Sequence, residues 1–150
     1  MQLTLHADFA LRTLIYLGTR PNTVIPASEV ATAYGVSVHH MAKVARLLTE
    51  EGYVSAARGK GGGIRLAKAP GEIVLGDVVR RTESSFDLVE CFDPNTNTCP
   101  ITHACVLARA LSEARDAFLQ TLDGYTLQDC LKHGDKITEL LQIRLPRKSR

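Results

Sequence analysis

The chain has 150 residues, of which 45% are hydrophobic and 23% charged, and its formal net charge is +2. These values are typical of a soluble globular domain with a sizeable core, and they exclude a collagen-like chain, a disordered tail and a disulfide-stapled small protein. No apolar run approaches the roughly 20 residues of a membrane span, and the first residues lack the pattern of a secretion signal. We therefore expect a cytoplasmic protein with no membrane partner.

The charge is unevenly distributed along the chain. Residues 1–70 carry eight Lys/Arg against four Asp/Glu, a net charge of +4, whereas residues 71–100 carry a net charge of −4. A basic N-terminal half suits a polyanionic partner, but a solvated basic face would give the same count. Charge alone therefore does not decide whether the protein binds nucleic acid.

The N-terminal half has the element order of a winged helix-turn-helix. Apolar periodicity and breaker residues predict three helices, over residues 4–18, 26–34 and 37–51. Gly35 ends the second of them, and Ser37 stands at the N-cap position of the third. Residues 53–57 and 64–66 flank a glycine-rich turn, which predicts a two-strand hairpin. We therefore expect a mainly α-helical fold with a small β hairpin.

The third predicted helix has an apolar and a polar face. Its buried side would carry Met41, Val44, Ala45 and Leu48. Its other side and the hairpin tip carry the candidate DNA contacts, which are Ser37, His39, His40, Lys43, Arg46, Arg58 and Lys60. Polar groups of this size suit base edges and phosphates in a major groove, and a glycine-rich tip allows close approach to the sugar-phosphate chain. Each residue alone is better explained as a solvated surface group, but the combination favours DNA binding.

The second half begins with a predicted helix over 75–82, in which Leu75, Val78 and Val79 point inward. Residues 84–104 look irregular, and a loop of this length is usually functional or disordered. A long helix over 105–123 and a short one over 126–132 follow. The long helix carries an apolar stripe of Leu107, Ala110, Leu111, Ala114, Phe118 and Leu122.

Three of the four cysteines, Cys91, Cys99 and Cys105, lie in or beside the irregular segment. In a reducing compartment, three cysteines on one irregular segment predict a metal or cluster site. Thiolates are soft ligands, which select zinc, copper(I) or iron–sulfur. Zinc sites usually contain close cysteine pairs, so the wide spacing favours a bulkier iron–sulfur cluster, unless His103 completes a zinc site. Cys130 is expected to be a small buried apolar residue.

Three thiolates leave one position of a four-ligand site open. An oxygen ligand there would make the iron reactive, as a sensor requires. Asp8 is a candidate, from the same chain or from a partner chain, but it is also placed for an i, i+4 ion pair with Arg12. A nucleophile pair of Cys105 with His103 would need a base and an oxyanion site, and the sequence signals neither, so we do not expect an enzyme.

The chain resembles the iron–sulfur winged-helix transcriptional regulators of the NsrR and IscR type, over nearly its whole length to about residue 141. The wing motif Arg-Gly-Lys-x-Gly-Gly at 58–63 and the three-cysteine loop are specific in combination. The other matching segments are 1–4 (MQLT), Asp8, 11–12, 14–16, 29–30, 34–37, 40–41, Lys43, 52–54, 64–66, 76–80, 99–102 and 125–127. The resemblance is closest to the nitric-oxide-sensitive members.

The resemblance implies a homodimeric repressor of nitric oxide detoxification genes, released from operator DNA when nitric oxide attacks its cluster. It implies that Cys91, Cys99 and Cys105 hold the cluster, with an aspartate at the Asp8 position as one type of fourth ligand. It also implies a dimer interface along the long helix, at Leu107, Leu111, Ala114, Phe118 and Leu122. The interval from Cys91 to Cys99 is longer than in some relatives, so it does not fix the ligand geometry or the cluster type. The resemblance favours a 4Fe–4S cluster with one non-thiolate ligand, and 2Fe–2S stays open. The alternative is a zinc-stabilised regulator, or one that senses cluster or redox state as the IscR type does.

These expectations divide the chain into four parts. They are a DNA-binding domain over 1–82, a cluster-binding loop over 83–104, a dimerisation helix with a C-terminal helix over 105–141, and a basic, disordered tail over 142–150.

Overall fold

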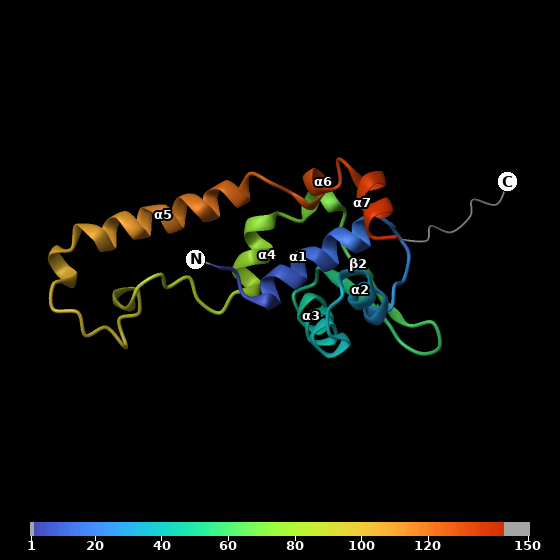
Figure 1. Cartoon of the computed structure of the whole chain (residues 1–150), viewed down its shortest axis with the longest axis horizontal. Coiled ribbons are helices and arrows are strands. Elements are labelled where there is room, and N and C mark those ends of the chain that lie inside the picture. The colour runs from blue at the N-terminus through green and yellow to red at the C-terminus, as the bar shows by residue number, and fades with distance from the viewer. Residues whose placement is uncertain (1, 143–150) are drawn as a thin grey trace.

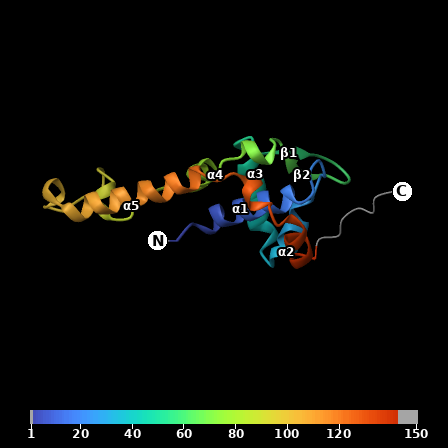
Figure 2. The ribbon, with the colours of Figure 1, turned by 90° about the horizontal axis from the view of Figure 1, so that it is seen from above.

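The computed structural model describes residues 2–142. Within them the helices are α1 (Leu5–Gly18), α2 (Ala27–Tyr34), α3 (Val38–Glu50), α4 (Leu75–Thr82), α5 (Val106–Asp123), α6 (Leu127–Cys130) and α7 (Gly134–Leu140), and the strands are β1 (Val54–Ala57) and β2 (Gly63–Leu66). Residues 4–82, which we call the head, pack with α6 and α7, while α5 extends away from them along the long axis of the molecule (Figures 1 and 2). None of the helices in the described range is long and apolar enough to cross a membrane.

The core of the head is built around α1. Leu14 and Leu17 of this helix are fully buried and belong to one cluster with Met41 and Leu48 of α3 and Leu127 of α6. Each such side chain contributes about 1.5–3 kcal/mol when it leaves water. The head is therefore held by one continuous core, to which the C-terminal segment contributes.

The helix-turn-helix is confirmed, and its turn depends on Gly35. This residue has φ +64°, a left-handed conformation that glycine adopts without the steric cost of a Cβ. Ser37 occupies the N-cap position of α3 as predicted, but its side chain makes no capping hydrogen bond. The inward face of α3 is confirmed in full, because Met41, Val44, Ala45 and Leu48 are all buried.

The predicted hairpin is also confirmed. Strands β1 and β2 are antiparallel, with Val54 opposite Leu66 and Ala57 opposite Gly63. Ile25, just before α2, pairs with Ile64 of β2 through two backbone hydrogen bonds of 2.9 Å. This pairing fixes the hairpin, the wing of the fold, relative to the helix-turn-helix.

The helix over 75–82, α4, has the predicted bounds, but the prediction that Leu75 points inward was wrong. Val78 and Val79 are buried, whereas Leu75 is only half-buried and Gly76 takes the buried place, against α5.

The segment over 84–104 contains only two short 3-10 turns, Glu90–Phe92 and Thr102–Ala104, as expected of an irregular loop. No residue of α5 is buried within the described chain.

The C-terminal prediction was incomplete. Instead of one helix over 126–132, the chain forms the single-turn α6 and a second helix, α7. Asp129 accepts hydrogen bonds from the backbone and hydroxyl of Thr126, a capping box that starts α6. Leu141, at the end of α7, packs on the core. Residues 143–150 lie outside the described part, and with them nearly all of the predicted tail.

Candidate nucleic-acid interface and cysteine site

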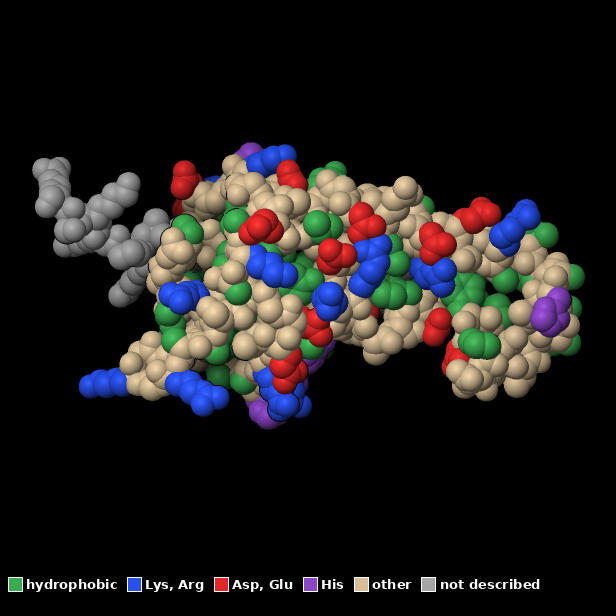
Figure 3. Space-filling model, turned by 180° about the vertical axis from the view of Figure 1, so that it is seen from behind, with side chains coloured by type: hydrophobic (Ala, Val, Ile, Leu, Met, Phe, Trp, Pro, Cys, Tyr) green, Lys and Arg blue, Asp and Glu red, His purple; other side chains and the backbone are tan. Residues whose placement is uncertain are grey.

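The seven candidate DNA contacts come from two elements and are all exposed. Ser37, His39, His40, Lys43 and Arg46 lie at the start and on the outer side of α3, whereas Arg58 and Lys60 lie in the loop between β1 and β2. In Figure 3, cationic side chains and histidines protrude from α3, and further cationic side chains extend from the wing beside it. The fold therefore presents both sets toward the same side of the head.

Arg46 is the candidate contact with a carboxylate partner. Its Nε lies 2.7 Å from Oε1 of Glu50, one turn further along α3, and this hydrogen bond raises the pKa of Arg46. Both side chains are exposed, so the pair is screened by water and contributes little to stability. A phosphate that contacts Arg46 has to compete with Glu50.

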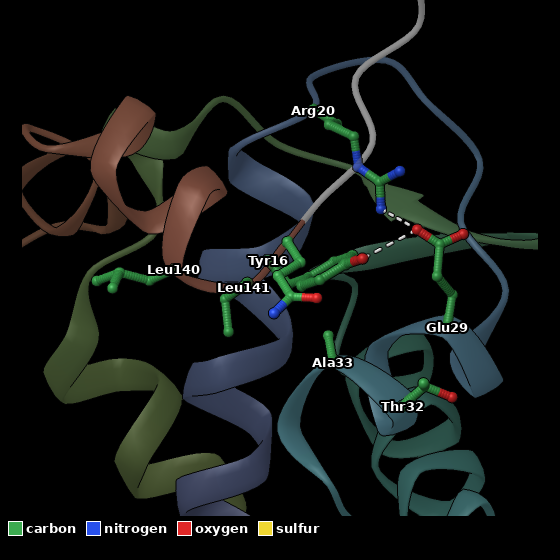
Figure 4. Close-up of a pocket in the computed structure, with 8 residues that line it drawn as sticks. Tyr16, Arg20, Glu29, Thr32, Ala33, Leu140 and Leu141 are labelled. Atoms are coloured by element: carbon green, nitrogen blue, oxygen red, sulfur yellow. Dashed lines mark hydrogen bonds and ion pairs between the residues drawn. The ribbon is translucent and has the colours of Figure 1, made fainter.

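A polar cluster that the sequence analysis missed fastens α2 to α1 (Figure 4). The hydroxyl of Tyr16 donates to Oε1 of Glu29 at 2.9 Å, and the guanidinium of Arg20 donates to the same oxygen. Arg20 also lies over the Tyr16 ring, 4.9 Å from its centroid, and its buried Nε has no hydrogen-bond partner among the described residues. Arg20 reads as part of a turn in the sequence, and only the fold brings it to Glu29.

This cluster shifts two pKa values. Burial, followed by the hydrogen bond to Glu29, raises the pKa of Tyr16 to about 12. Burial alone would raise the pKa of Glu29, but the bonds from Arg20 and Tyr16 outweigh it and hold that pKa below its usual value. The three residues line a cavity of about 630 Å³ that also includes Leu140 and Leu141 of the α7 end. The hydrogen bonds to Glu29 thus join α2 to Tyr16 of α1 and to Arg20, which follows α1.

The three predicted cysteine ligands meet at one cavity. Cys91, Cys99 and Cys105 are half-buried free thiols, and they line a cavity of about 240 Å³. The cavity lies at the N-terminal end of α5, the end that is far from the head in Figure 1. The other lining residues are Val89, Glu90, Ile101, Leu107, Ala108 and Leu111. The cavity is therefore largely apolar apart from the three thiols and one carboxylate.

Hydrogen bonds within the loop hold two of these cysteines. The side-chain oxygen of Asn97 accepts from the backbone N–H of Cys99 at 3.0 Å, and its amide donates to the hydroxyl of Thr102 at 3.0 Å. Cys105 is the N-cap of α5, and its Sγ accepts from the N–H of Ala108 at 3.4 Å. The irregular segment is thus ordered by its own polar side chains.

The carboxylate at the cavity belongs to Glu90, which the sequence analysis did not consider. Its Oε1 accepts from the hydroxyl and from the backbone N–H of Thr98, both at 2.6 Å. These two bonds hold the pKa of Glu90 below its usual value. In the sequence, the only indication that Glu90 lies at this site is that it directly precedes Cys91.

The other candidate ligands are not brought to the cysteines. Asp8 does not line the cavity; its carboxylate lies 2.7 Å from the guanidinium of Arg12, the ion pair that the i, i+4 spacing indicated. His103 is exposed and lines a different hollow. Cys130 lies on α6, half-buried against the core, and burial raises the pKa of its thiol. The structure therefore does not bring Asp8 to the three cysteines of its own chain.

The three thiols form a soft donor set. Across residues 2–142, no three His, Cys, Asp or Glu side chains are close enough to hold one metal ion. A polynuclear cluster spans a wider gap between thiolates than one ion does, and soft sulfur donors suit iron–sulfur. Three thiols around one apolar cavity are thus compatible with an iron–sulfur cluster that lacks a fourth ligand from this chain's thiols.

Comparison with known proteins assigns the family. Residues 3–133 match the Rrf2 family, described as an iron-dependent transcriptional regulator. The chain is 44% identical over 145 residues to the HTH-type transcriptional regulator NsrR of Bacillus subtilis (strain 168), covering 96% of this chain and 99% of that protein. It is 46% identical over 147 residues to the regulator of the same name from Geobacillus kaustophilus (strain HTA426), with the same coverage.

Solved structures show the same fold. The structure of T. potens IscR superposes with a TM-score of 0.72 at 20% identity, covering 97% of this chain and 94% of that one. The structure of CymR, the global cysteine regulator of B. subtilis, superposes with a TM-score of 0.67 at 23% identity, covering 89% and 98%. The family and these relatives are transcriptional regulators and not enzymes, and the winged-helix fold is confirmed. The chain belongs to the Rrf2 family of transcriptional regulators.

Proposed function

We propose that the protein is a homodimeric iron–sulfur repressor that binds palindromic operator DNA in the cytoplasm and releases it in response to nitric oxide. The observation that supports this most strongly is the meeting of Cys91, Cys99 and Cys105 at one cavity. These are the residues that the resemblance to nitric-oxide-sensitive regulators assigns to the cluster.

The chain's own contribution to the cofactor site is three thiolates in an apolar setting. Val89 and Leu111, both half-buried, would shield part of the site from water, and the N–H of Ala108 would donate to the Cys105 thiolate. When bound, a cluster supplies iron that reacts with nitric oxide, and we favour 4Fe–4S over 2Fe–2S. Because Asp8 does not line the cavity of its own chain, it would have to come from the partner subunit to serve as the fourth ligand.

Dimerisation is assigned to α5. Val106 and Leu107 are 69% and 64% exposed, and the rest of the apolar stripe on this helix is at most half-buried. An 18-residue helix with no buried residue is not stabilised by its own head over most of its length. A second copy packed along Leu107, Leu111, Ala114, Phe118 and Leu122 would bury this stripe.

The dimer would place two heads on one operator. Two α3 helices about 34 Å apart reach successive major grooves on one side of the duplex. The seven exposed residues on α3 and the wing are the proposed contacts. The loop over 83–104 joins α4 of the head to α5, so loss of its thiolate anchors would loosen the link between the head and the dimer helix.

An anaerobic titration on operator DNA tests the proposal, with holo, nitrosylated and cluster-free protein compared at one salt concentration. Cluster loss or nitrosylation should weaken binding by at least about tenfold, roughly 1.4 kcal/mol, and the dimer should persist. Equal affinity for all three forms would contradict the sensing function. A colourless protein that carries zinc, or a cluster protein whose DNA binding responds to oxidation but not to nitric oxide, would favour the alternative regulator.

A further inference from the structure

The C-terminal end of α5 is attached to the head at two places. Beyond α5, the N–H of Leu75 donates to the carbonyl of Tyr125 at 2.9 Å, and the N–H of Leu127 donates to the carbonyl of Ile73 at 2.8 Å. Further along α4, the Arg80 guanidinium donates two hydrogen bonds to the last residue of α5, 2.5 Å to Oδ1 and 2.7 Å to Oδ2 of Asp123. One attachment alone would let α5 turn about it, and the second restricts that rotation.

The absence of a side chain at Gly76 leaves room for the ion pair between Arg80 and Asp123. It is buried on α4, and a Cβ added to it would lie 1.9 Å from Oδ1 of Asp123 and 2.9 Å from a terminal nitrogen of Arg80. Alanine forms helices better than glycine, so propensity does not explain a glycine at the second position of α4. The close approach of Asp123 does explain it.

The helix α4 also contacts the C-terminal end of α3, the helix that carries most of the candidate DNA contacts. Arg81 donates to Oε2 of Glu51 at 2.6 Å, and Glu51 is the C-cap of α3. Two adjacent arginines of α4 therefore contact α5 on one side and the end of α3 on the other. Val78 and Val79, both fully buried, fix α4 itself in the head.

We infer that Arg80 and Asp123 are positioning residues that set the angle between α5 and the head, and through it the half-site spacing that the dimer accepts. The inference rests on the proposed function, because it requires a dimer through α5 on a palindromic operator. An α5 of 18 residues is about 27 Å long, so a change of about 10° at its joint moves its far end by roughly 5 Å. One base pair rises only about 3.4 Å, so a loose joint would accept several spacings.

The test uses full-length wild type, Asp123→Asn, Arg80→Gln and Gly76→Ala. The probes are a palindromic duplex that the wild type selects from random DNA, the same duplex with one base pair added or removed between its halves, and a single half-site. Each variant should lower the preference for the selected spacing by about fivefold or more. Affinity for the single half-site should stay within about twofold, because the contact surface is unchanged.

Glu113→Gln is the matched control, since it neutralises an exposed carboxylate of α5 whose cationic neighbour, Arg109, is on the same helix at 3.7 Å. It should keep the wild-type spacing preference. Unchanged preference in all three variants would overturn the inference, and so would an equal loss on the single half-site, which would mean damage to the head. A wild type that selects no palindrome would contradict the proposed function itself, and the inference with it.

Discussion

The carboxylate of Asp8 lies 2.7 Å from the guanidinium of Arg12, one turn further along α1. The pair is held by a hydrogen bond of 2.9 Å from Nε of Arg12, and both side chains are partly exposed. Such a pair contributes only about 0.3–0.5 kcal/mol. Asp8 can therefore leave Arg12 at low cost if a metal of a partner subunit competes for its carboxylate.

The first prediction concerns this carboxylate. Asp8→Ala should keep the visible absorption of the cluster but change its rate of reaction with nitric oxide, because water or a small thiol replaces a labile ligand. Stopped-flow absorption under anaerobic conditions measures the rate. Glu90→Gln is the comparison, since Glu90 is the carboxylate that lines the cavity in its own chain. A changed rate in Glu90→Gln with an unchanged rate in Asp8→Ala would assign the fourth ligand to Glu90.

The second prediction concerns the thiolates. Serine at Cys91, Cys99 or Cys105 should abolish the visible colour in each case, because a cluster with three thiolates does not tolerate the loss of one. The readout is the anaerobic absorption spectrum together with iron and sulfide content. Cys130→Ser is the control, because Cys130 lies half-buried on α6 and does not line the cavity. Bleaching by Cys130→Ser would show that the ligand assignment is wrong.

The sequence predicts local structure well where a local signal exists. Gly35 ends α2, the apolar spacing from Met41 to Leu48 defines the buried face of α3, and Cys105 directly precedes α5. Each of these is decided by neighbours within a few residues. The convergence of the three cysteines on one cavity agrees with their common loop, and Asn97 contributes to it by a hydrogen bond over two residues.

Long-range pairings could not be predicted in the same way. Gly76 looks like a poor helix residue in the sequence, and its reason appears only when Asp123 of α5 is found against it. Arg20 stands in a turn, and its partner Glu29 is brought to it by the packing of α2 on α1. The helix α7 was missed because Gly134 disfavours a helix start, while its stabilising contact, Leu141 on the core, depends on the fold.

The third prediction separates phosphate contacts from base contacts. Arg46→Ala and Lys60→Ala should weaken binding to all sequences alike and reduce the salt slope by about one unit each. Changes at His40 or Lys43 should cost about 1–3 kcal/mol per lost base contact and relax one operator position. Binding titrations at several salt concentrations, on matched and mismatched duplexes, measure both effects.

A substitution at Glu50 should change DNA affinity in the opposite direction to these variants. It pairs with Arg46 at 2.7 Å, so Glu50→Gln should strengthen binding to all sequences by freeing the guanidinium for phosphate. Lys136→Ala on α7, away from α3 and the wing, should leave DNA binding unchanged. If the wing variants alter sequence preference instead, the wing reads bases and α3 does not act alone.

The fourth prediction concerns alkaline stability. The pKa of Tyr16 is raised from 10.0 to about 12 in the folded protein, so the folded state keeps a proton that the unfolded state releases between these values. The stabilisation is therefore complete below pH 10 and is lost as the pH rises toward 12, by roughly 2–3 kcal/mol. Denaturant unfolding of wild type and Tyr16→Phe across this range measures it. The difference between the two should shrink with pH, whereas the exposed Tyr125→Phe should behave as wild type; a constant difference would contradict the assignment.

The fifth prediction concerns the dimer. Ala114 is an exposed residue in the middle of the α5 stripe and lines none of the cavities described above. In a monomer, Ala114→Glu would change stability by less than about 0.5 kcal/mol. In a dimer through this stripe it buries an unpaired charge, which costs several kcal/mol, about 3–5 for a fully buried one. The dimer dissociation constant should then rise by about 100-fold or more.

Sedimentation equilibrium measures this constant, and Gln120→Glu is the matched control, because it adds the same charge to an exposed position on the other side of α5. The control should remain dimeric. Ala114→Glu should still bind a single half-site, because its head is untouched, but it should lose the additional affinity for a palindrome. A dimer that persists in Ala114→Glu would move the interface away from the stripe. The groove of about 500 Å³ that Phe118 and Arg115 form with Glu83 and residues 85–89 would then be the next surface to test.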